Sequence, residues 1–205
     1  MTTTATTIRS TATAKDSIPQ SLPQTTADPT VTIRPAIPDD AETLVALIRE
    51  LAEYEKLLHE AHPSVERLRQ HLDADAQPGC EALVAETQEG EPAGFALYFF
   101  NYSTFLTRFG LYLEDLFVRP DHRGHGVGFR LLQRVAQAAA DYGCERMDWA
   151  VLDWNQSAID FYRQLGAKPL NDWTTMRLET EAIQSVANVR SAERPNARTD
   201  ETLDG

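Results

Sequence analysis

Three consecutive segments with the pattern of β-strands, with no helical segment between them, constrain the fold of this chain most strongly. They lie at about residues 80–86, 92–101 and 111–118, and a Gly-containing turn at residues 89–91 joins the first two. A doubly wound nucleotide-binding fold alternates strands with helices, so it does not fit this order. The chain is therefore expected to form an α+β domain with a mixed, mostly antiparallel sheet flanked by helices.

Helical periodicity and turn signals place the other elements around these strands. Apolar side chains at helical spacing from Leu44 to Leu51 predict one helix, and Gly143 and Gly166 are expected to end two later helices. The expected order is β-α-α-β-β-β-α-β-α-β. It consists of strands at residues 31–35, 80–86, 92–101, 111–118, 145–151 and 174–178, and helices at about residues 39–56, 63–72, 126–141 and 155–165.

The two ends of the chain differ in composition from its middle. Residues 1–30 are rich in Thr, Ser and Pro, and residues 179–205 are polar. Such segments bury no core, so both are expected to be disordered tails around a single domain at residues 31–178. Ile183, Val186 and Val189 hint at a short helix in the second tail. An organelle transit peptide is an open alternative for the first tail, but its few basic residues favour a tail without function.

The chain is acidic, with a formal net charge of −12 over 205 residues, and the excess of acids persists between residues 31 and 178. This charge repels phosphate backbones and attracts cations, so no nucleic-acid partner is expected. No apolar run approaches the roughly 18 residues that span a bilayer, so no membrane partner is expected either. Cys80 and Cys144 form no metal or disulfide pattern, which favours a soluble protein in the reducing cytoplasm.

The stretch from Arg123 to Gly128, RGHGVG, is the most informative motif for function. It lies between an expected strand and an expected helix, where three glycines let the main chain approach a ligand and direct its N–H groups at an anion. The dipole of the helix that follows also favours a phosphate there, and Arg123 is expected to supply positive charge at the entrance of the loop. A simple Gly-rich turn is the structural alternative. A P-loop does not fit because no Gly-Lys-Ser/Thr follows, and a G-x-G-x-x-G fingerprint fails at Leu131.

A third interpretation of this loop is the pattern Arg-x-x-Gly-x-Gly of the GCN5-related N-acetyltransferases (GNAT), and the surrounding blocks support it. The run LYLEDLFVRPDHRGHGVG at residues 111–128 resembles the core of diamine acetyltransferases of the spermidine/spermine type. The blocks IRPA and ELAEYE before it, and AVLDWNQ and DFYRQLGA after it, are similar to the same family. The blocks follow the family order over about residues 31–178. The resemblance therefore implies the GNAT fold and an acetyl-CoA-dependent N-acetyltransferase.

By this resemblance, main-chain groups hold most of the cosubstrate acetyl-CoA. The loop would bind its pyrophosphate. The strand end before the loop would pair with the pantetheine arm as an added strand, and the Val118 N–H would donate to the oxyanion. Asn155 has two readings, a CoA contact and a helix cap, and both can hold at once. The residues implied for binding acetyl-CoA are Phe117, Val118, Arg123, Gly124, His125, Gly126, Val127, Gly128 and Asn155.

Acetyl transfer needs one group that takes a proton from the amine and another that protonates the departing thiolate. The resemblance implies Tyr162 as the acid and Glu114 as the base, acting through a water, while a packed core residue is the alternative for Tyr162. Neighbouring strand residues point to opposite faces, so Asp115 is expected to be structural, satisfied by main chain or by an Arg. Tyr54 and Glu55 match family positions that touch substrate, as Glu114 does; a solvated helix end is the alternative.

No metal is expected. His59, His62, His122 and His125 lack a ligand pattern and are interpreted as surface residues. The sequence shows no Ser-His-Asp or Cys-His arrangement of the kind used in nucleophilic catalysis.

The expected substrate is a primary amine on a small cationic molecule. Spermidine enzymes carry Tyr-Asp-Pro-Trp where this chain has YSTF at residues 102–105; this block and AVLDWNQ resemble the thialysine acetyltransferase branch. Loss of that carboxylate predicts that thialysine-like amino acids or short diamines are better substrates than spermine. A protein or peptide N-acetyltransferase, a non-catalytic acyl-CoA-binding protein and an enzyme that acylates an antibiotic or toxin are the alternatives. The family commonly forms homodimers, so the resemblance also implies a homodimer.

Overall fold

The computed structural model describes residues 30–76 and 79–188. Contacts divide the chain into two compact units, residues 1–167 and 168–205. The first unit contains a sheet and four α-helices, and the second contains a short helix, α5 (Thr180–Ala187). The expected N-terminal tail lies outside the described residues except for Thr30, and so does the C-terminal tail beyond Asn188.

A five-stranded sheet in the order β1-β2-β3-β4-β5 forms the centre of the first unit. Strands β1 to β4 pair antiparallel with their neighbours, whereas β5 joins β4 in parallel. This confirms the mixed, mostly antiparallel sheet that the order of segments predicts. The strands are β1 (Val31–Pro35), β2 (Glu81–Thr87), β3 (Pro92–Ser103), β4 (Arg108–Val118) and β5 (Met147–Asp148).

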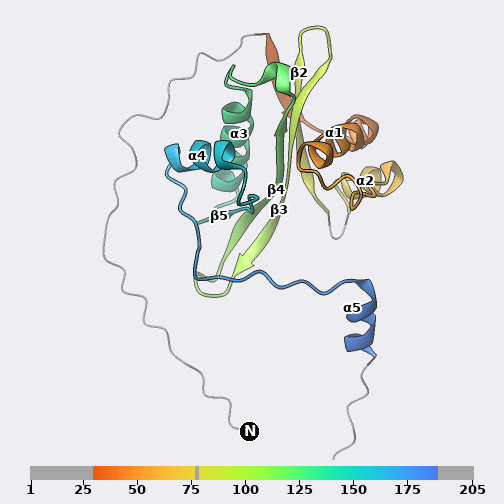
Figure 1. Ribbon diagram of the computed structural model, residues 1–205, viewed down its shortest axis with the longest axis vertical. Helices are drawn as coiled ribbons and strands as arrows, with labels where there is room; N and C mark the ends of the chain where they lie inside the picture. Colours follow the sequence, from red (N-terminus) through yellow and green to blue (C-terminus); the bar gives the residue numbers. More distant parts are fainter. Residues whose placement is uncertain (1–29, 77–78, 189–205) are drawn as a thin grey trace, which may run out of the picture. The chain divides into compact units, whose positions relative to one another are not determined.

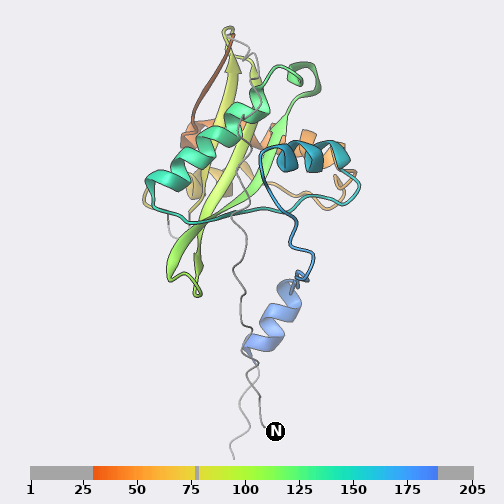
Figure 2. The ribbon, with the colours of Figure 1, turned by 90° about the vertical axis from the view of Figure 1, so that its left-hand side faces the viewer.

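Helices cover both faces of this sheet (Figure 1). Helices α1 (Ala41–Tyr54) and α2 (Val65–His71) pack on one face, and α3 (Val127–Asp141) and α4 (Gln156–Gln164) pack on the other. Figure 2 shows α3 running obliquely across the strands. Two short 3-10 helices, η1 (Pro38–Asp40) and η2 (Pro120–His122), precede α1 and α3.

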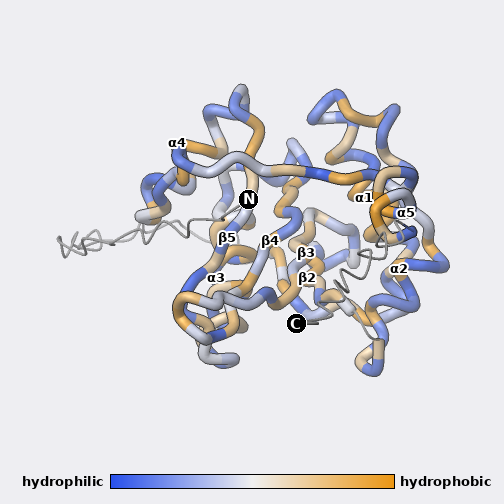
Figure 3. The backbone as a smooth tube through the Cα atoms, turned by 90° about the horizontal axis from the view of Figure 1, so that it is seen from below, coloured by the Kyte–Doolittle hydropathy of each residue, from blue (hydrophilic) through white to orange (hydrophobic). Residues whose placement is uncertain are grey.

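Each face of the sheet has its own hydrophobic core, because alternate strand residues point to opposite faces. Hydrophobic and hydrophilic residues alternate along the helices (Figure 3), and α1 and α3 bury their apolar sides in these cores. The core on the α3 side includes Leu111, Leu113, Leu131 and Val135; the core on the α1 side includes Leu44, Leu47, Phe95 and Phe117. Burial of these side chains holds the strands that carry the site in place.

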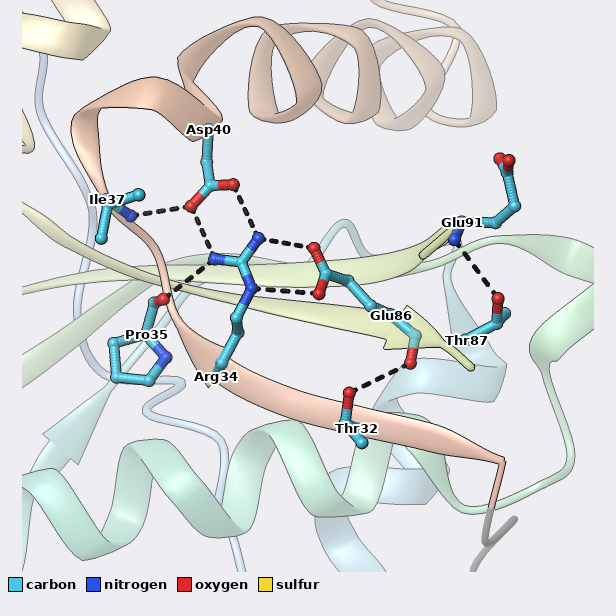
Figure 4. Close-up of polar contacts among 8 residues, drawn as sticks. All are labelled: Thr32, Arg34, Pro35, Ile37, Asp40, Glu86, Thr87 and Glu91. Atoms are coloured by element: carbon cyan, nitrogen blue, oxygen red, sulfur yellow. Dashed lines mark hydrogen bonds and ion pairs between the residues drawn. The ribbon is translucent and has the colours of Figure 1, made fainter. Parts of the chain in front are cut away.

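Arg34 joins three elements on the α1 side of the molecule (Figure 4). Its guanidinium donates to both carboxylate oxygens of Glu86 in β2, at 3.0 and 2.5 Å, and to both of Asp40 in η1, at 2.7 and 2.8 Å. Asp40 also accepts from the Ile37 N–H at 2.8 Å. The hydrogen bonds from Arg34 lower the pKa of Asp40 below its ordinary value. These bonds tie β1 to β2 and to the start of α1.

The structure corrects two of the expected strands. β5 has two residues where a strand at residues 145–151 is expected, because the chain leaves β4 after Asp148. Residues 174–178 form no strand: they have no regular structure, and Met176 is 86% exposed. Alternating apolar residues suit a strand, but a strand also needs a hydrogen-bonding neighbour that no local pattern supplies. In the second unit, the expected short helix is confirmed as α5, which contains Ile183 and Val186, whereas Val189 lies outside the described residues.

Candidate active site

The site lies where β4 and β5 separate. They pair only at Leu111 with Met147 and at Tyr112 with Asp148. Beyond these pairs a cavity of about 470 Å³ opens between the last residues of β4 and the chain after β5. Its lining residues are Leu51, Tyr54, Glu55, residues 113–118, His122, Arg123, Gly124, residues 126–129, residues 149–151, Asn155, Ser157, Ala158, Phe161 and Tyr162. All predicted site residues except His125, which is exposed, therefore come together around this cavity.

The Gly-rich loop forms one end of the cavity and leads into α3. Gly126 is the N-cap residue of α3 with a φ of 77°, a left-handed conformation that favours glycine. No side chain caps this helix, and its first turn contains no acidic residue. The first N–H groups of α3 therefore have no side-chain acceptor and stay available to an anion. This is the arrangement expected for binding a pyrophosphate.

One main-chain segment of β4 faces the opening. The Arg119 N–H bonds to the Ala93 carbonyl of β3 at 2.9 Å. Main-chain groups of successive strand residues point to opposite sides, so those of Val118 point away from β3, into the opening. By the same alternation, the main chain of Phe117 points to β3. Val118 rather than Phe117 thus directs its N–H and C=O into the opening, where a pantetheine arm would need them, and Phe117 contributes its ring.

Gly94 of β3 lets this end of β4 lie close to its neighbour. A Cβ at this position would overlap the carbonyl oxygen of Phe117. The close pairing keeps the last residues of β4 attached to β3 after they leave β5. Arg119 supports the same end from the other side, because its guanidinium donates to both carboxylate oxygens of Glu50 in α1, at 2.8 and 2.6 Å.

Arg123 turns inward rather than standing at the entrance of the loop. Its Nε donates to the carbonyl oxygen of Val118 at 2.8 Å. Its guanidinium carbon lies 4.5 Å from the centre of the Tyr54 ring and 5.7 Å from that of Phe117. The motif predicts a positively charged side chain here but not where it points, because the residues that the Arg123 side chain contacts belong to α1 and β4.

Tyr54 and the start of α4 form a wall of the cavity. The Tyr54 ring lies 5.8 Å from that of Trp154, and its hydroxyl lies 3.5 Å from the Asn155 side-chain oxygen. Asn155 also accepts from the Ala158 N–H at 3.3 Å, which confirms it as the cap of α4. Tyr54 therefore belongs to the site and not to a fully solvated helix end.

Tyr162 lies on α4 in a mostly apolar setting that includes the rings of Trp149, at 4.9 Å, and Phe161, at 5.2 Å. Burial, together with the negative charge of Asp115, raises the pKa of Tyr162 to about 12. The hydroxyl therefore keeps its proton at neutral pH, as a general acid must. Trp149, which the sequence did not point to, helps fix the ring.

Three carboxylates line the cavity: Glu55, Glu114 and Asp115. Glu114 is exposed, whereas Glu55 and Asp115 are partly buried. Burial raises the pKa of Glu55, and burial with the charges of Glu114 and Glu55 raises the pKa of Asp115 to about 7. No described residue gives the Asp115 carboxylate a hydrogen bond or an arginine partner, so the expected partners of Asp115, main chain or an Arg, are not found among those residues. The expected division of Glu114 and Asp115 between separate faces also fails, because both line one cavity.

The described part of the chain contains no group of three His, Cys, Asp or Glu side chains that could hold a metal ion. Among those residues, no helix is long and apolar enough to cross a membrane.

Comparisons with known proteins agree with this geometry. The sequence model of the acetyltransferase (GNAT) family matches residues 45–167. The chain is 42% identical over 167 residues to thialysine N-epsilon-acetyltransferase of Bos taurus, and the alignment covers 77% of this chain and 97% of that protein.

The chain belongs to the GNAT family of acetyltransferases. It is therefore an acetyltransferase.

This GNAT protein also resembles a second curated protein in sequence and a solved structure in fold. It is 31% identical over 164 residues to spermidine/spermine N(1)-acetyltransferase-like protein 1 of Homo sapiens, covering 76% of this chain and 23% of that protein. Among solved structures, an integron cassette protein from the mobile metagenome of V. cholerae superposes with a TM-score of 0.64 and 26% identity, over 78% of this chain and 98% of that one. The GNAT fold expected from the sequence is confirmed.

Proposed function

We propose that this enzyme moves an acetyl group from acetyl-CoA to a primary amine of a small cationic molecule, a thialysine-like amino acid or a short diamine. The observation that carries the proposal is the composition of a single cavity. A Gly-rich helix start and a free strand edge, suited to acetyl-CoA, meet three carboxylates and a protonated tyrosine, suited to an ammonium and its chemistry.

The proposed binding site for acetyl-CoA rests on main-chain groups that face the cavity. The open start of α3 after Gly126 would receive the pyrophosphate, and the N–H and C=O of Val118 would pair with the pantetheine arm. Arg123 currently bonds to that carbonyl, so binding requires its guanidinium to give up this contact. Released, it would add a positive charge beside the diphosphate.

The proposed binding site for the amine substrate rests on the charge of the residues that line the cavity. Glu55, Glu114 and Asp115 present carboxylates to one cavity. Arg123, the one Arg or Lys among the lining residues, is engaged with Val118 and Tyr54. An ammonium is the group that such a surface attracts.

The chemistry needs three events. A carboxylate takes a proton from the ammonium, because an alkylammonium has no lone pair. The amine nitrogen then attacks the thioester carbon, and the Val118 N–H would donate to the oxyanion. When the C–S bond breaks, Tyr162 protonates the sulfur. Glu114 is the carboxylate that the family resemblance implies for the first event.

The choice of amine rests on the similarity to thialysine N-epsilon-acetyltransferases and on residues 102–105, which lack an acid. A long polycation needs an additional anion to hold its remote ammonium. Loss of that anion therefore weakens the binding of spermine more than the binding of a short amine. The homodimer implied by the resemblance stays a prediction.

Thiol release from acetyl-CoA, measured over a panel of small amines and peptides, tests the proposal. We expect a higher kcat/KM for thialysine or short diamines than for spermine, and no turnover of peptides. A preference for spermine would contradict the choice of amine, and turnover of peptides alone would favour a protein acetyltransferase.

The variant Tyr162→Phe separates an enzyme from a protein that only binds acyl-CoA. It should lower kcat by about 100-fold or more, as loss of a general acid does, while CoA affinity in calorimetry stays unchanged. Full activity in this variant would remove Tyr162 as the acid.

A further inference from the structure

We propose that Arg123 also selects the acyl donor: its side chain occupies the pantetheine-binding end of β4 and leaves it only for a ligand that carries a diphosphate. This inference rests on the proposed use of acetyl-CoA. It gives Arg123 a role in specificity beyond its positive charge beside the diphosphate.

Arg123 occupies the main-chain group that a pantetheine arm would use. Its Nε donates to the carbonyl oxygen of Val118 at 2.8 Å. The Arg119 N–H bonds to the Ala93 carbonyl, so the main-chain groups of Val118 point away from β3 and into the cavity. The bond from Arg123 therefore lies in the opening itself and not on the paired side of β4.

Two aromatic rings hold the guanidinium of Arg123 inside the cavity. The guanidinium carbon lies 4.5 Å from the centre of the Tyr54 ring on α1 and 5.7 Å from that of the Phe117 ring on β4. Arginine stacks on aromatic faces, and the attraction is stronger where water is partly excluded. The side chain thus lies between the two elements that border the pantetheine position, and it competes with a pantetheine arm for that space.

A β-bulge in β4 places negative charge on the same side of the sheet. Leu97 of β3 pairs with Asp115, but the next residue, Tyr98, pairs with Leu113, so Glu114 is an extra residue in β4. Leu97 belongs to the core on the α1 side, whereas Leu113 belongs to the core on the α3 side. Residues paired across a sheet share a face, so the Asp115 carboxylate faces α1. Its charge favours a cation near that helix.

The start of α3 offers the guanidinium a different partner. Arg123 directly follows η2 and lies three residues before Gly126, the N-cap of α3. Gly124 lies between them, and a Cβ at this glycine would meet no atom within 4 Å, so the loop leaves space beside Arg123. A diphosphate at the free N–H groups of α3 would accept charge-assisted hydrogen bonds from Arg123. Such bonds are stronger than a single bond to a neutral carbonyl.

This change of partner makes the affinity for an acyl donor depend on its diphosphate. When a CoA thioester binds, Arg123 replaces its contacts with Val118 and Tyr54 by bonds to the phosphates. When a thioester of pantetheine alone binds, Arg123 loses the same contacts and gains none. The free energy of the lost contacts then lowers the affinity for that ligand. Arg123 therefore discriminates against acyl donors whose pantetheine lacks the diphosphate.

The first test compares the affinities for pantetheine and for CoA, measured by NMR titration of the full-length protein, in the wild type and in Arg123→Ala. We expect the affinity for pantetheine to rise about tenfold in the variant, because no contact has to be displaced. The affinity for CoA should fall, because the diphosphate loses a partner. If Arg123 only attracted the diphosphate, the affinity for pantetheine would not change, and that result would overturn the proposal.

Arg163→Ala is the matched control for the loss of one positive charge. Arg163 lies on α4 outside the cavity, and its side chain is 55% exposed and pairs with Asp160 at 4.0 Å. Both affinities should stay at the wild-type values. An equal rise in pantetheine affinity in Arg163→Ala and Arg123→Ala would assign the effect to net charge and contradict the proposal.

Variants of Tyr54 weaken the hold on the guanidinium without changing Arg123. Tyr54→Leu removes the ring beneath the guanidinium, whereas Tyr54→Phe keeps the ring and removes only the hydroxyl that lies 3.5 Å from the Asn155 side-chain oxygen. We expect the affinities for pantetheine and CoA to rise about threefold in Tyr54→Leu and to stay near the wild-type values in Tyr54→Phe. Lower affinity for both ligands in Tyr54→Leu would show that the ring does not hold Arg123 in place.

The wild-type protein allows a test that needs no variant. Inorganic pyrophosphate should draw Arg123 away from Val118, so it should raise the affinity for pantetheine about fivefold or more relative to sodium chloride at the same ionic strength. This coupling should be absent in Arg123→Ala. An equal affinity with and without pyrophosphate in the wild type would refute the inference.

The same measurements separate this inference from the proposed function. If the wild type binds CoA and Arg123→Ala leaves the affinity for pantetheine unchanged, only the role of Arg123 in donor choice is wrong. If the folded wild type has no affinity for CoA, the proposed function itself is overturned.

Discussion

At the scale of single residues, the site depends on a few side chains whose identity is visible in the sequence and whose direction is not. Arg123 is recognisable from its motif, but its guanidinium points at Val118 and Tyr54 instead of the entrance. Asp115 is recognisable as an acid in an apolar strand, but the bulge beside it decides which face it joins.

Gly126 offers a test of the pyrophosphate loop. Gly126→Ala places a Cβ on a residue with a φ of 77°, which costs about 1 kcal/mol of stability and shifts the N–H groups at the start of α3. We expect CoA affinity, measured by calorimetry, to fall about tenfold or more.

Gly143 provides the matched control, because it follows the other end of α3 with the same φ of 77° and lies outside the cavity. Gly143→Ala should lower the free energy of unfolding by a similar amount without changing CoA affinity. Equal affinity in both variants would argue against a pyrophosphate at the loop.

At the scale of elements, Arg34 joins β1, β2 and the start of α1, so it should stabilise their arrangement. Replacing it by Met removes bonds to Asp40 and Glu86 but keeps much of its volume. We expect Arg34→Met to lower the free energy of unfolding by about 1–2 kcal/mol in urea denaturation.

The pH dependence of that loss identifies its source. The pKa of Asp40 is lowered in the folded protein, so its contribution is present above the ordinary pKa of a carboxyl group and disappears as the pH falls through the lowered value. The difference between wild type and Arg34→Met should therefore shrink in acid. The control is Arg69→Met, which removes an exposed ion pair with Glu66 in which the N–O distance is 3.9 Å. It should lower the free energy of unfolding by less than about 0.5 kcal/mol at any pH.

At the scale of the whole molecule, the net charge of −12 should attract cationic substrates over a distance. Salt screens this attraction, since the Debye length falls to about 10 Å at 0.1 M. We expect kcat/KM for a diamine to fall about threefold or more between about 20 and 200 mM salt, with a smaller effect for a monoamine and little change in kcat. A rate independent of salt would limit the role of charge to the cavity itself.

The sequence by itself determined the order of the elements as far as α4, the helix ends at glycines, the Gly-rich loop before α3 and the residue types that line the cavity. These features arise from local periodicity, main-chain conformations and spacing, which short segments carry. Only the tertiary structure decided that β4 and β5 separate after two pairs, that a bulge turns Asp115 toward α1 and that residues 174–178 form no strand. Those outcomes depend on hydrogen bonds and packing between segments far apart in the chain, so no local pattern contains them.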